Sequence, residues 1–156
     1  MKLPNYPRFL LILATMPAIV SAADESQIPP PLACHKFTES VFFESARSGA
    51  DRSLPTAVAS ESDLRMLGRN LELILQFQQH RFRVIGYTDD HECEGQECFA
   101  LSRQRAESVH QWLVAHGAPE HLFIEVTGLG NSNPIDWNDT PEQRAHNRRV
   151  ELVEEH

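Results

Sequence analysis

The sequence is poor in basic residues. Its 156 residues include 14 Lys and Arg against 22 Asp and Glu, which gives a formal net charge of -8. Proteins that bind duplex nucleic acid need basic patches to displace counterions, so this charge balance argues against a nucleic-acid partner. Hydrophobic residues make up 41% and charged residues 23% of the chain. These fractions are typical of a globular protein and exclude collagen-like, coiled-coil and wholly disordered classes, and the length suits one ordinary domain.

Cysteine is also scarce, and recognised catalytic signatures are missing from the sequence. Three cysteines are too few for a scaffold held together by many disulfides. The sequence contains no Ser-His-Asp set, no carboxylate pair in a glycosidase context and no H-E-x-x-H zinc motif. The eight histidines are scattered, as is typical of solvated helix and turn positions. We therefore predict a protein that is not an enzyme and that has no cofactor and no metal site.

Only one long apolar run occurs, and it lies near the N-terminus. Lys2 and Arg8 precede an uncharged stretch from Phe9 to Val20, and the small residues that follow suit cleavage by a signal peptidase after Ala22. The run is shorter than the roughly 20 apolar residues of a spanning helix, and the alternative is a buried helix of the fold. We predict a signal peptide over residues 1–22, which would deliver a mature chain without a transmembrane segment to the periplasm. No cysteine stands directly after the cleavage site, so a lipid anchor is not expected.

The rest of the chain divides into a linker and one domain. Residues 23–37 contain three consecutive prolines, which favour an extended linker because proline has no amide donor. Residues 38–156 alternate between strand and helix patterns, which predicts a layered sheet with helices on one face. The expected strands are Val41–Phe43, Arg81–Tyr87, Leu122–Thr127 and Arg149–Glu154, and the expected helices are Ser60–Gln79, Ser102–His116 and a short helix after Thr140.

Capping residues indicate where these helices begin. Ser60 or Ser62 suits the N-cap of the first helix, and Ser102 suits the N-cap of the second, which Gly117 would end. The run from Thr140 to Gln143 matches a capping box with proline at the first helical position.

Four short segments occur in a fixed order along the domain. They are Val84–Asp89 (VIGYTD), Leu101–Val109 (LSRQRAESV), Gly128–Pro134 (GLGNSNP) and Asn147–Glu151 (NRRVE). Together they resemble the C-terminal domain of OmpA, which is shared with the peptidoglycan-associated lipoprotein and with flagellar motor stator proteins. The resemblance covers about Thr38 to the end of the chain. It implies an α+β fold, a two-layer β-α-β-α-β-β sandwich whose mixed four-stranded sheet carries two main helices on one face. It also implies non-covalent binding to the peptide stem of peptidoglycan.

The resemblance further implies a ligand site at Asp89 and Arg105. In the family, an aspartate that ends the second strand and an arginine of the next helix hold the zwitterionic end of meso-diaminopimelate. The chemistry agrees, because an aspartate suits an ammonium group and the arginine fork binds a carboxylate bidentately. A helix that starts at Ser102 would place Arg105 in the first turn, whose free amides favour the same anion. The alternative is a plain surface salt bridge between Asp89 and Arg105. In both cases we expect these residues at a surface pocket and not in the core.

Four more residues are expected beside this site. Thr88 and Leu101 flank the two ligand-binding residues and would shape the pocket. Asn147 and Arg148 match the N-R-R-V element beside the site in the family, and the alternative for them is turn capping and a solvated strand start. Ala46 lies where some relatives carry a polar residue that contacts the ligand, which leaves open a weaker affinity or a different preferred stem.

Two of the three cysteines lie five residues apart in the loop before the second helix. In an oxidising compartment the simplest interpretation is a Cys93–Cys98 disulfide, which would fix the spacing of the two ligand-binding residues. The alternative is a metal site of His91, both cysteines and a carboxylate, although this spacing matches zinc motifs poorly. Cys34 has no assigned partner.

Three functions are compatible with these features. The first is a periplasmic module that binds peptidoglycan, in contact with the cell wall and the outer membrane. The second is an envelope adaptor whose main partner is another protein and which uses the wall as a tether. The third is a cell-wall enzyme, which the lack of catalytic motifs disfavours.

Overall fold

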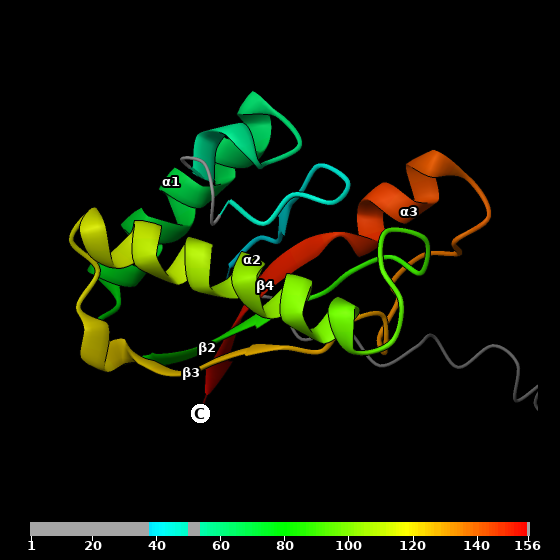
Figure 1. The fold of residues 1–156 in the computed structure, drawn as a ribbon. Helices are drawn as coiled ribbons and strands as arrows, with labels where there is room; N and C mark the ends of the chain where they lie inside the picture. Colours follow the sequence, from blue (N-terminus) through cyan, green and yellow to red (C-terminus); the bar gives the residue numbers. More distant parts are fainter. Residues whose placement is uncertain (1–37, 50–53, 156) are drawn as a thin grey trace, which may run out of the picture. The chain divides into compact units, whose positions relative to one another are not determined.

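The structure is a computed structural model that describes residues 38–49 and 54–155 (Figure 1). The predicted signal peptide (residues 1–22), the predicted linker (residues 23–37) and Cys34 lie outside the described residues. Within the described part of the chain, no helix combines the length and the apolar character needed to cross a bilayer.

The described residues build one mixed sheet of four strands in the order β1-β4-β2-β3. Strand β2 (Arg81–Gly86) runs parallel to β3 (Phe123–Gly128). Strand β4 (Arg149–Glu155) lies between β2 and β1 (Val41–Phe42) and runs antiparallel to both. The predicted α+β fold with a mixed four-stranded sheet is therefore confirmed.

In residues 38–49 and 54–155, three α-helices accompany the sheet (Figure 1). Helix α1 (Glu61–Gln76) starts at the predicted cap Ser60, whose side chain accepts a hydrogen bond from a first-turn amide. Helix α2 (Gln96–Ala115) crosses β2 and β3, and the short helix α3 (Pro141–Asn147) begins with the predicted capping box. Two 3-10 turns, Leu54–Thr56 and Glu120–Leu122, complete the elements of the described part.

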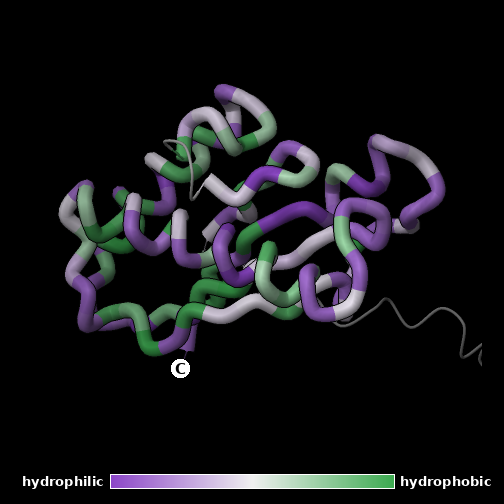
Figure 2. The backbone as a smooth tube through the Cα atoms, in the orientation of Figure 1, coloured by the Kyte–Doolittle hydropathy of each residue, from purple (hydrophilic) through white to green (hydrophobic). Residues whose placement is uncertain are grey.

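The core lies between the two long helices and one face of the sheet. Its side chains alternate along the strands and recur at helical spacing on α1 and α2, as amphipathic elements require. Figure 2 shows hydrophobic residues (green) gathered in the sheet, whereas the loop after β2 is mostly hydrophilic (purple). Fully buried members include Leu67 and Ile74 of α1, Ala106, Val109 and Leu113 of α2, Phe82 and Val84 of β2, and Val150 of β4.

The start of α2 differs from the prediction. The helix begins at Gln96, so Ser102 lies inside it and does not cap it. The Ser102 side chain is fully buried, and its hydroxyl donates to the Phe99 carbonyl (3.1 Å) and accepts from the Gly130 amide (2.9 Å). A serine hydroxyl can bond a carbonyl in the preceding turn as readily as it caps a helix, and this ambiguity explains the error.

The backbone of α2 lies so close to the sheet that only glycine fits at position 86. A Cβ built there would lie 1.9 Å from the Ser102 carbonyl oxygen, and one built at Gly128 on β3 would lie 2.2 Å from the Arg103 amide nitrogen. Both contacts are with backbone atoms, which cannot rotate away. The helix therefore lies closer to these two strands than any side chain would permit.

Replacement of Gly86 by alanine is expected to lower the free energy of unfolding by about 1–3 kcal/mol, the usual cost of overpacking. Gly68→Ala is the matched control, because Gly68 lies in α1 with no atom within 4 Å of the added Cβ. That control is expected to raise stability by about 0.5–1 kcal/mol. Urea unfolding followed by circular dichroism measures both, and equal stabilities would contradict the close approach.

Candidate functional site

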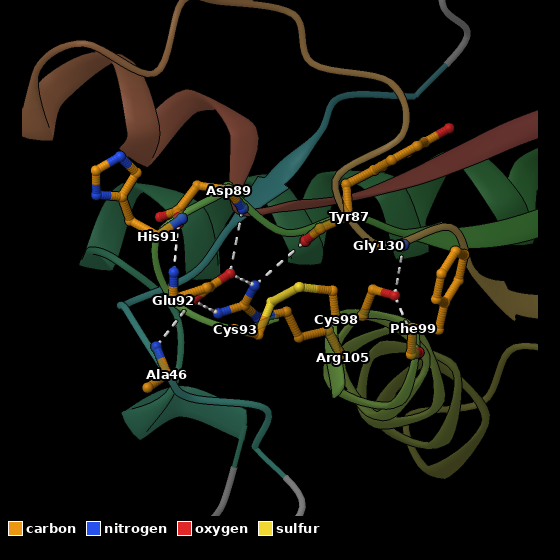
Figure 3. Close-up of a disulfide and its surroundings, with 11 residues drawn as sticks. Ala46, Tyr87, Asp89, His91, Glu92, Cys93, Cys98, Phe99, Arg105 and Gly130 are labelled. Atoms are coloured by element: carbon orange, nitrogen blue, oxygen red, sulfur yellow. Dashed lines mark hydrogen bonds and ion pairs between the residues drawn. A yellow bond between two sulfur atoms is a disulfide. The ribbon is translucent and has the colours of Figure 1, made fainter. Parts of the chain in front are cut away.

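Sheet topology brings three segments together at one end of β4. The antiparallel register pairs Phe42 of β1 with Arg149, and Gly86 of β2 with Val150. The turn after β1 and the loop after β2 therefore both lie beside Arg148, the residue that precedes β4. Helix α2 follows the loop and brings Arg105 to the same place (Figure 3).

Arg105 is held by a carboxylate that the sequence did not indicate, that of Glu92. The two side chains form a bidentate pair, with 2.5 Å from Nη1 to Oε1 and 2.7 Å from Nη2 to Oε2. Both side chains are 0% exposed. Parallel N–H···O bonds of this kind are among the strongest hydrogen bonds in proteins. The pair links the middle of α2 to the loop after β2.

Backbone carbonyls take the other donors of Arg105. Its Nε donates to the Arg47 carbonyl (2.8 Å), and Nη2 also donates to the Glu44 carbonyl (3.0 Å). Its Nη1 also donates to the Tyr87 carbonyl (3.2 Å). With Glu92, these contacts engage all five N–H donors of the guanidinium. The expectation that Arg105 lies at a surface pocket, in the first turn of its helix, is therefore wrong: the residue is buried and lies in the middle of α2.

Asp89 is buried as well, but its ionic partner is Arg148. Asp89 Oδ2 lies 2.8 Å from Arg148 Nη1, and the two side chains are 2% and 13% exposed. Asp89 Oδ1 accepts from the amides of His91 (2.7 Å) and Glu92 (2.8 Å), so the same carboxylate shapes the loop. The structure thus brings Asp89, Arg105 and Arg148 into one network through Glu92, and the suggested Asp89–Arg105 salt bridge is not formed.

Sequence patterns do not single out Glu92. The segment between β2 and the first turn of α2 is rich in acidic side chains, and most of them are exposed. Only the arrangement of the fold shows which one faces Arg105. One local signal exists: an aspartate commonly accepts from amides two and three residues later, and this turn directs Glu92 inward. The acidic residues of the segment are Asp89, Asp90, Glu92, Glu94 and Glu97.

Thr88 and Leu101 lie next to the network. Thr88 is buried, its amide donates to the Gly130 carbonyl (3.0 Å), and its hydroxyl has no hydrogen-bond partner among the described residues. Leu101 is half-buried on α2, one turn before Arg105, and helical residues four apart share a face.

Both polar atoms of the Asn147 side chain form hydrogen bonds with the loop before α3. Its Oδ1 accepts from the amides of Ile135 (2.8 Å) and Asp136 (3.1 Å). Its Nδ2 donates to the Asp136 carbonyl (2.9 Å) and to Asn138 Oδ1 (2.8 Å). These contacts agree with the turn-holding alternative that the sequence left open for this residue.

A third ion pair, between Arg149 and Glu151, lies on the other face of β4. Arg149 Nε donates to Glu151 Oε1 (2.7 Å), and the Arg149 guanidinium lies 4.0 Å from the centre of the Tyr87 ring. Burial, followed by the charge of Glu151, raises the pKa of the Tyr87 hydroxyl, which therefore stays protonated at neutral pH. Tyr87 thus contacts both arginines: its carbonyl accepts a hydrogen bond from Arg105, and its ring packs against the Arg149 guanidinium.

The predicted disulfide is present between Cys93 and Cys98, with 5.1 Å between the two Cα atoms. Cys98 is buried in the first turn of α2, and Cys93 follows Glu92 directly, so the bridge fastens the Glu92 loop to the helix that carries Arg105 (Figure 3). The sulfur atoms are bonded to each other and do not serve as thiolate ligands. Among the described residues, no three His, Cys, Asp or Glu side chains are grouped to hold a metal ion.

Replacement of both bridge cysteines by serine is expected to lower the free energy of unfolding by at most about 2 kcal/mol, because the closed loop is short. Urea titration measures the effect, with Cys34→Ser as the control for the change from cysteine to serine. Alkylation of both cysteines in unreduced protein would show that the bridge is absent.

This arrangement defines the class of protein: an α+β domain with a mixed sheet and a buried Asp–Arg network where β2 passes into α2. The chain belongs to the OmpA family, whose family model matches residues 58–148.

Two curated relatives illustrate the similarity. The peptidoglycan-binding protein ArfA of Mycobacterium tuberculosis is 44% identical over 93 residues, which cover 59% of this chain and 28% of ArfA. The probable lipoprotein YiaD of Escherichia coli is 36% identical over 103 residues, which cover 61% of this chain and 45% of YiaD. This chain therefore spans less than half the length of either relative.

Solved structures share the fold. The peptidoglycan-associated lipoprotein from Burkholderia pseudomallei superposes with a TM-score of 0.63 at 23% identity, covering 76% of this chain and 91% of that one. The C-terminal domain of Helicobacter pylori MotB superposes with a TM-score of 0.61 at 25% identity, covering 76% and 84%.

Proposed function

We propose that this protein binds peptidoglycan non-covalently through the diaminopimelate end of its peptide stem and so attaches to the cell wall. The proposal rests on one observation: Arg105 binds the Glu92 carboxylate bidentately, and Asp89 belongs to the same hydrogen-bond network. Membership of the OmpA family and the name of its relative ArfA as a peptidoglycan-binding protein support the choice of ligand.

The two charged residues suit the two ends of a free amino acid group. Arg105 already holds a carboxylate in this protein, and its planar fork matches that group better than a lysine would. Asp89 offers an anion for the ammonium, which would take the place that Arg148 Nη1 occupies in this structure. Arg148 is the more exposed partner of that pair, and its Nε also donates to the Phe43 carbonyl (3.0 Å), so the ammonium would have to displace only the Nη1 contact.

Neighbouring residues would complete the pocket. The buried Thr88 hydroxyl bonds to none of the described residues and could therefore bond to a ligand, and Leu101 supplies apolar surface on the preceding helical turn. Asn147 holds the adjoining loop in place. A hollow of about 320 Å³, lined in part by Ala46 and Arg47, lies beside the network and offers room for more of the stem.

The proposed location is the periplasm, next to the outer membrane and the wall, after removal of residues 1–22. Curated relatives carry corresponding names: YiaD is described as a probable lipoprotein, and YfiB of Pseudomonas aeruginosa as an outer-membrane lipoprotein. None of the relatives compared above is named for an enzymatic activity.

Co-sedimentation with purified sacculi, stripped of bound proteins, tests the proposal. The mature protein is expected to sediment with the wall and to leave it intact. A folded protein that stays in the supernatant would contradict wall binding and favour the adaptor function, in which another envelope protein is the main partner. Release of soluble muropeptides would reveal a cell-wall enzyme instead.

A further inference from the structure

The carboxylate of Glu92 occupies a complete anion site. Besides the two nitrogens of Arg105, the amide of Ala46 donates to Oε2 (2.8 Å) and the amide of Asp89 donates to Oε1 (3.3 Å). Figure 3 shows these donors converging on the Glu92 side chain from different directions. Four N–H donors around one carboxylate form a site that binds an anion through charge-assisted hydrogen bonds.

The donors of this carboxylate site come from three separate elements of the fold. Arg105 is in the middle of α2, Asp89 follows β2, and Ala46 lies in the turn after β1. Ala46 has φ of 54°, and no other non-glycine residue among the described ones has a positive φ. Such a backbone costs about 1–2 kcal/mol for a residue with a Cβ, and here it coincides with an amide that donates to the anion. The donors of the carboxylate site therefore come from the turn after β1, the end of β2 and helix α2, and the Glu92 carboxylate occupies the site that they form.

Glu92 must rotate its side chain out of this site before an external anion can bind, because the adjoining Cys93–Cys98 bridge keeps its backbone attached to α2. Glu92 belongs to the loop between β2 and α2, where Asp90, His91 and Glu94 are exposed to solvent. Arg105, in contrast, is fixed by carbonyls of three other residues in addition to Glu92. Since all five donors of the guanidinium are engaged, a second carboxylate can be bound bidentately only after the first has withdrawn.

We propose that Glu92 is a built-in occupant of the ligand carboxylate site, which an external carboxylate must displace before it can bind Arg105. The inference rests on the proposed function for the identity of that ligand, the carboxylate of diaminopimelate. Under this proposal, Glu92 lowers the affinity of Arg105 for the ligand carboxylate. The observed dissociation constant equals the intrinsic one divided by the fraction of molecules in which Glu92 has withdrawn.

Chemical rescue tests whether the site accepts an external carboxylate, without any use of peptidoglycan. In Glu92→Ala the guanidinium stays buried and has lost its anion, so Tm falls, and acetate is expected to raise it again. Wild type and Glu94→Ala, which removes an exposed acid from the same loop, should not respond to acetate. Sodium chloride at the same ionic strength is the salt control. A Glu92→Ala Tm that does not respond to acetate would overturn the proposal.

Titration with a purified diaminopimelate muropeptide tests displacement. Glu92→Ala is expected to bind at least about tenfold more tightly than wild type and Glu94→Ala, which corresponds to an open fraction of about a tenth or less in wild type. Glu92→Gln keeps a hydrogen-bonding side chain for the fold and should also bind more tightly, which covers the case that Glu92→Ala does not fold. Equal or weaker binding by the folded variants would overturn displacement. If wild type and every variant fail to bind, the proposed function fails, and the acetate result alone decides whether the site accepts an external carboxylate.

Discussion

Arg105→Ala is expected to lower the free energy of unfolding by about 3–5 kcal/mol, the usual cost of removing one partner of a buried ion pair. The loss leaves the Glu92 carboxylate buried with only two amide donors, and it leaves three backbone carbonyls without the guanidinium that they bind. Urea unfolding of the mature protein, followed by circular dichroism, measures the change.

Arg103→Ala is the matched control on the same helix. Arg103 pairs with Glu107 at the surface, with side chains 67% and 41% exposed, so this variant should stay within about 0.5 kcal/mol of wild type. The double variant Arg105→Ala with Glu92→Ala should be more stable than the sum of the two single effects implies, because it leaves no unpaired buried charge. Equal stability of the Arg103 and Arg105 variants would contradict the buried pair.

The second large effect concerns binding. Asp89→Asn is expected to weaken wall binding by about 2–5 kcal/mol, because the ammonium of the ligand loses the anion that it faces. That loss is enough to abolish sacculus retention by a weak binder. Asparagine keeps a side-chain oxygen that can accept from the amides of His91 and Glu92, so the loop should keep its shape.

Asp90→Asn controls for the change in charge. Asp90 is exposed beside Asp89 and belongs to the same loop, so its replacement should leave retention unchanged. Co-sedimentation with diaminopimelate-type sacculi compares the two variants, with circular dichroism to verify folding. Normal retention of folded Asp89→Asn protein would show that this aspartate does not hold the ligand.

Local sequence signals account for most of the framework. The capping box at Thr140 and the serine cap at Ser60 depend on residues three positions apart, and both are present. The strand patterns of β2 and β4 depend on alternation within a few residues. The disulfide followed from the short spacing of Cys93 and Cys98 in a chain expected to be exported.

The partners of the charged residues could not be predicted in this way. Arg105 donates to carbonyls of Arg47 and Glu44, which are 58 and 61 positions away in the sequence. Arg148 reaches Asp89 across 59 positions. No pattern within a helix or strand encodes such pairs, because they depend on the order of strands in the sheet. The burial of Arg105 was missed for the same reason, since an arginine without a visible partner is expected at the surface.

The most direct test of the central claim compares two kinds of cell wall. Wild-type mature protein is mixed with sacculi whose stems carry meso-diaminopimelate and, in parallel, with walls whose stems carry lysine and lack its zwitterionic end. A site built from Asp89 and Arg105 for an ammonium and a carboxylate predicts retention on the diaminopimelate wall and little on the lysine wall. Equal retention on both walls would contradict the assigned ligand.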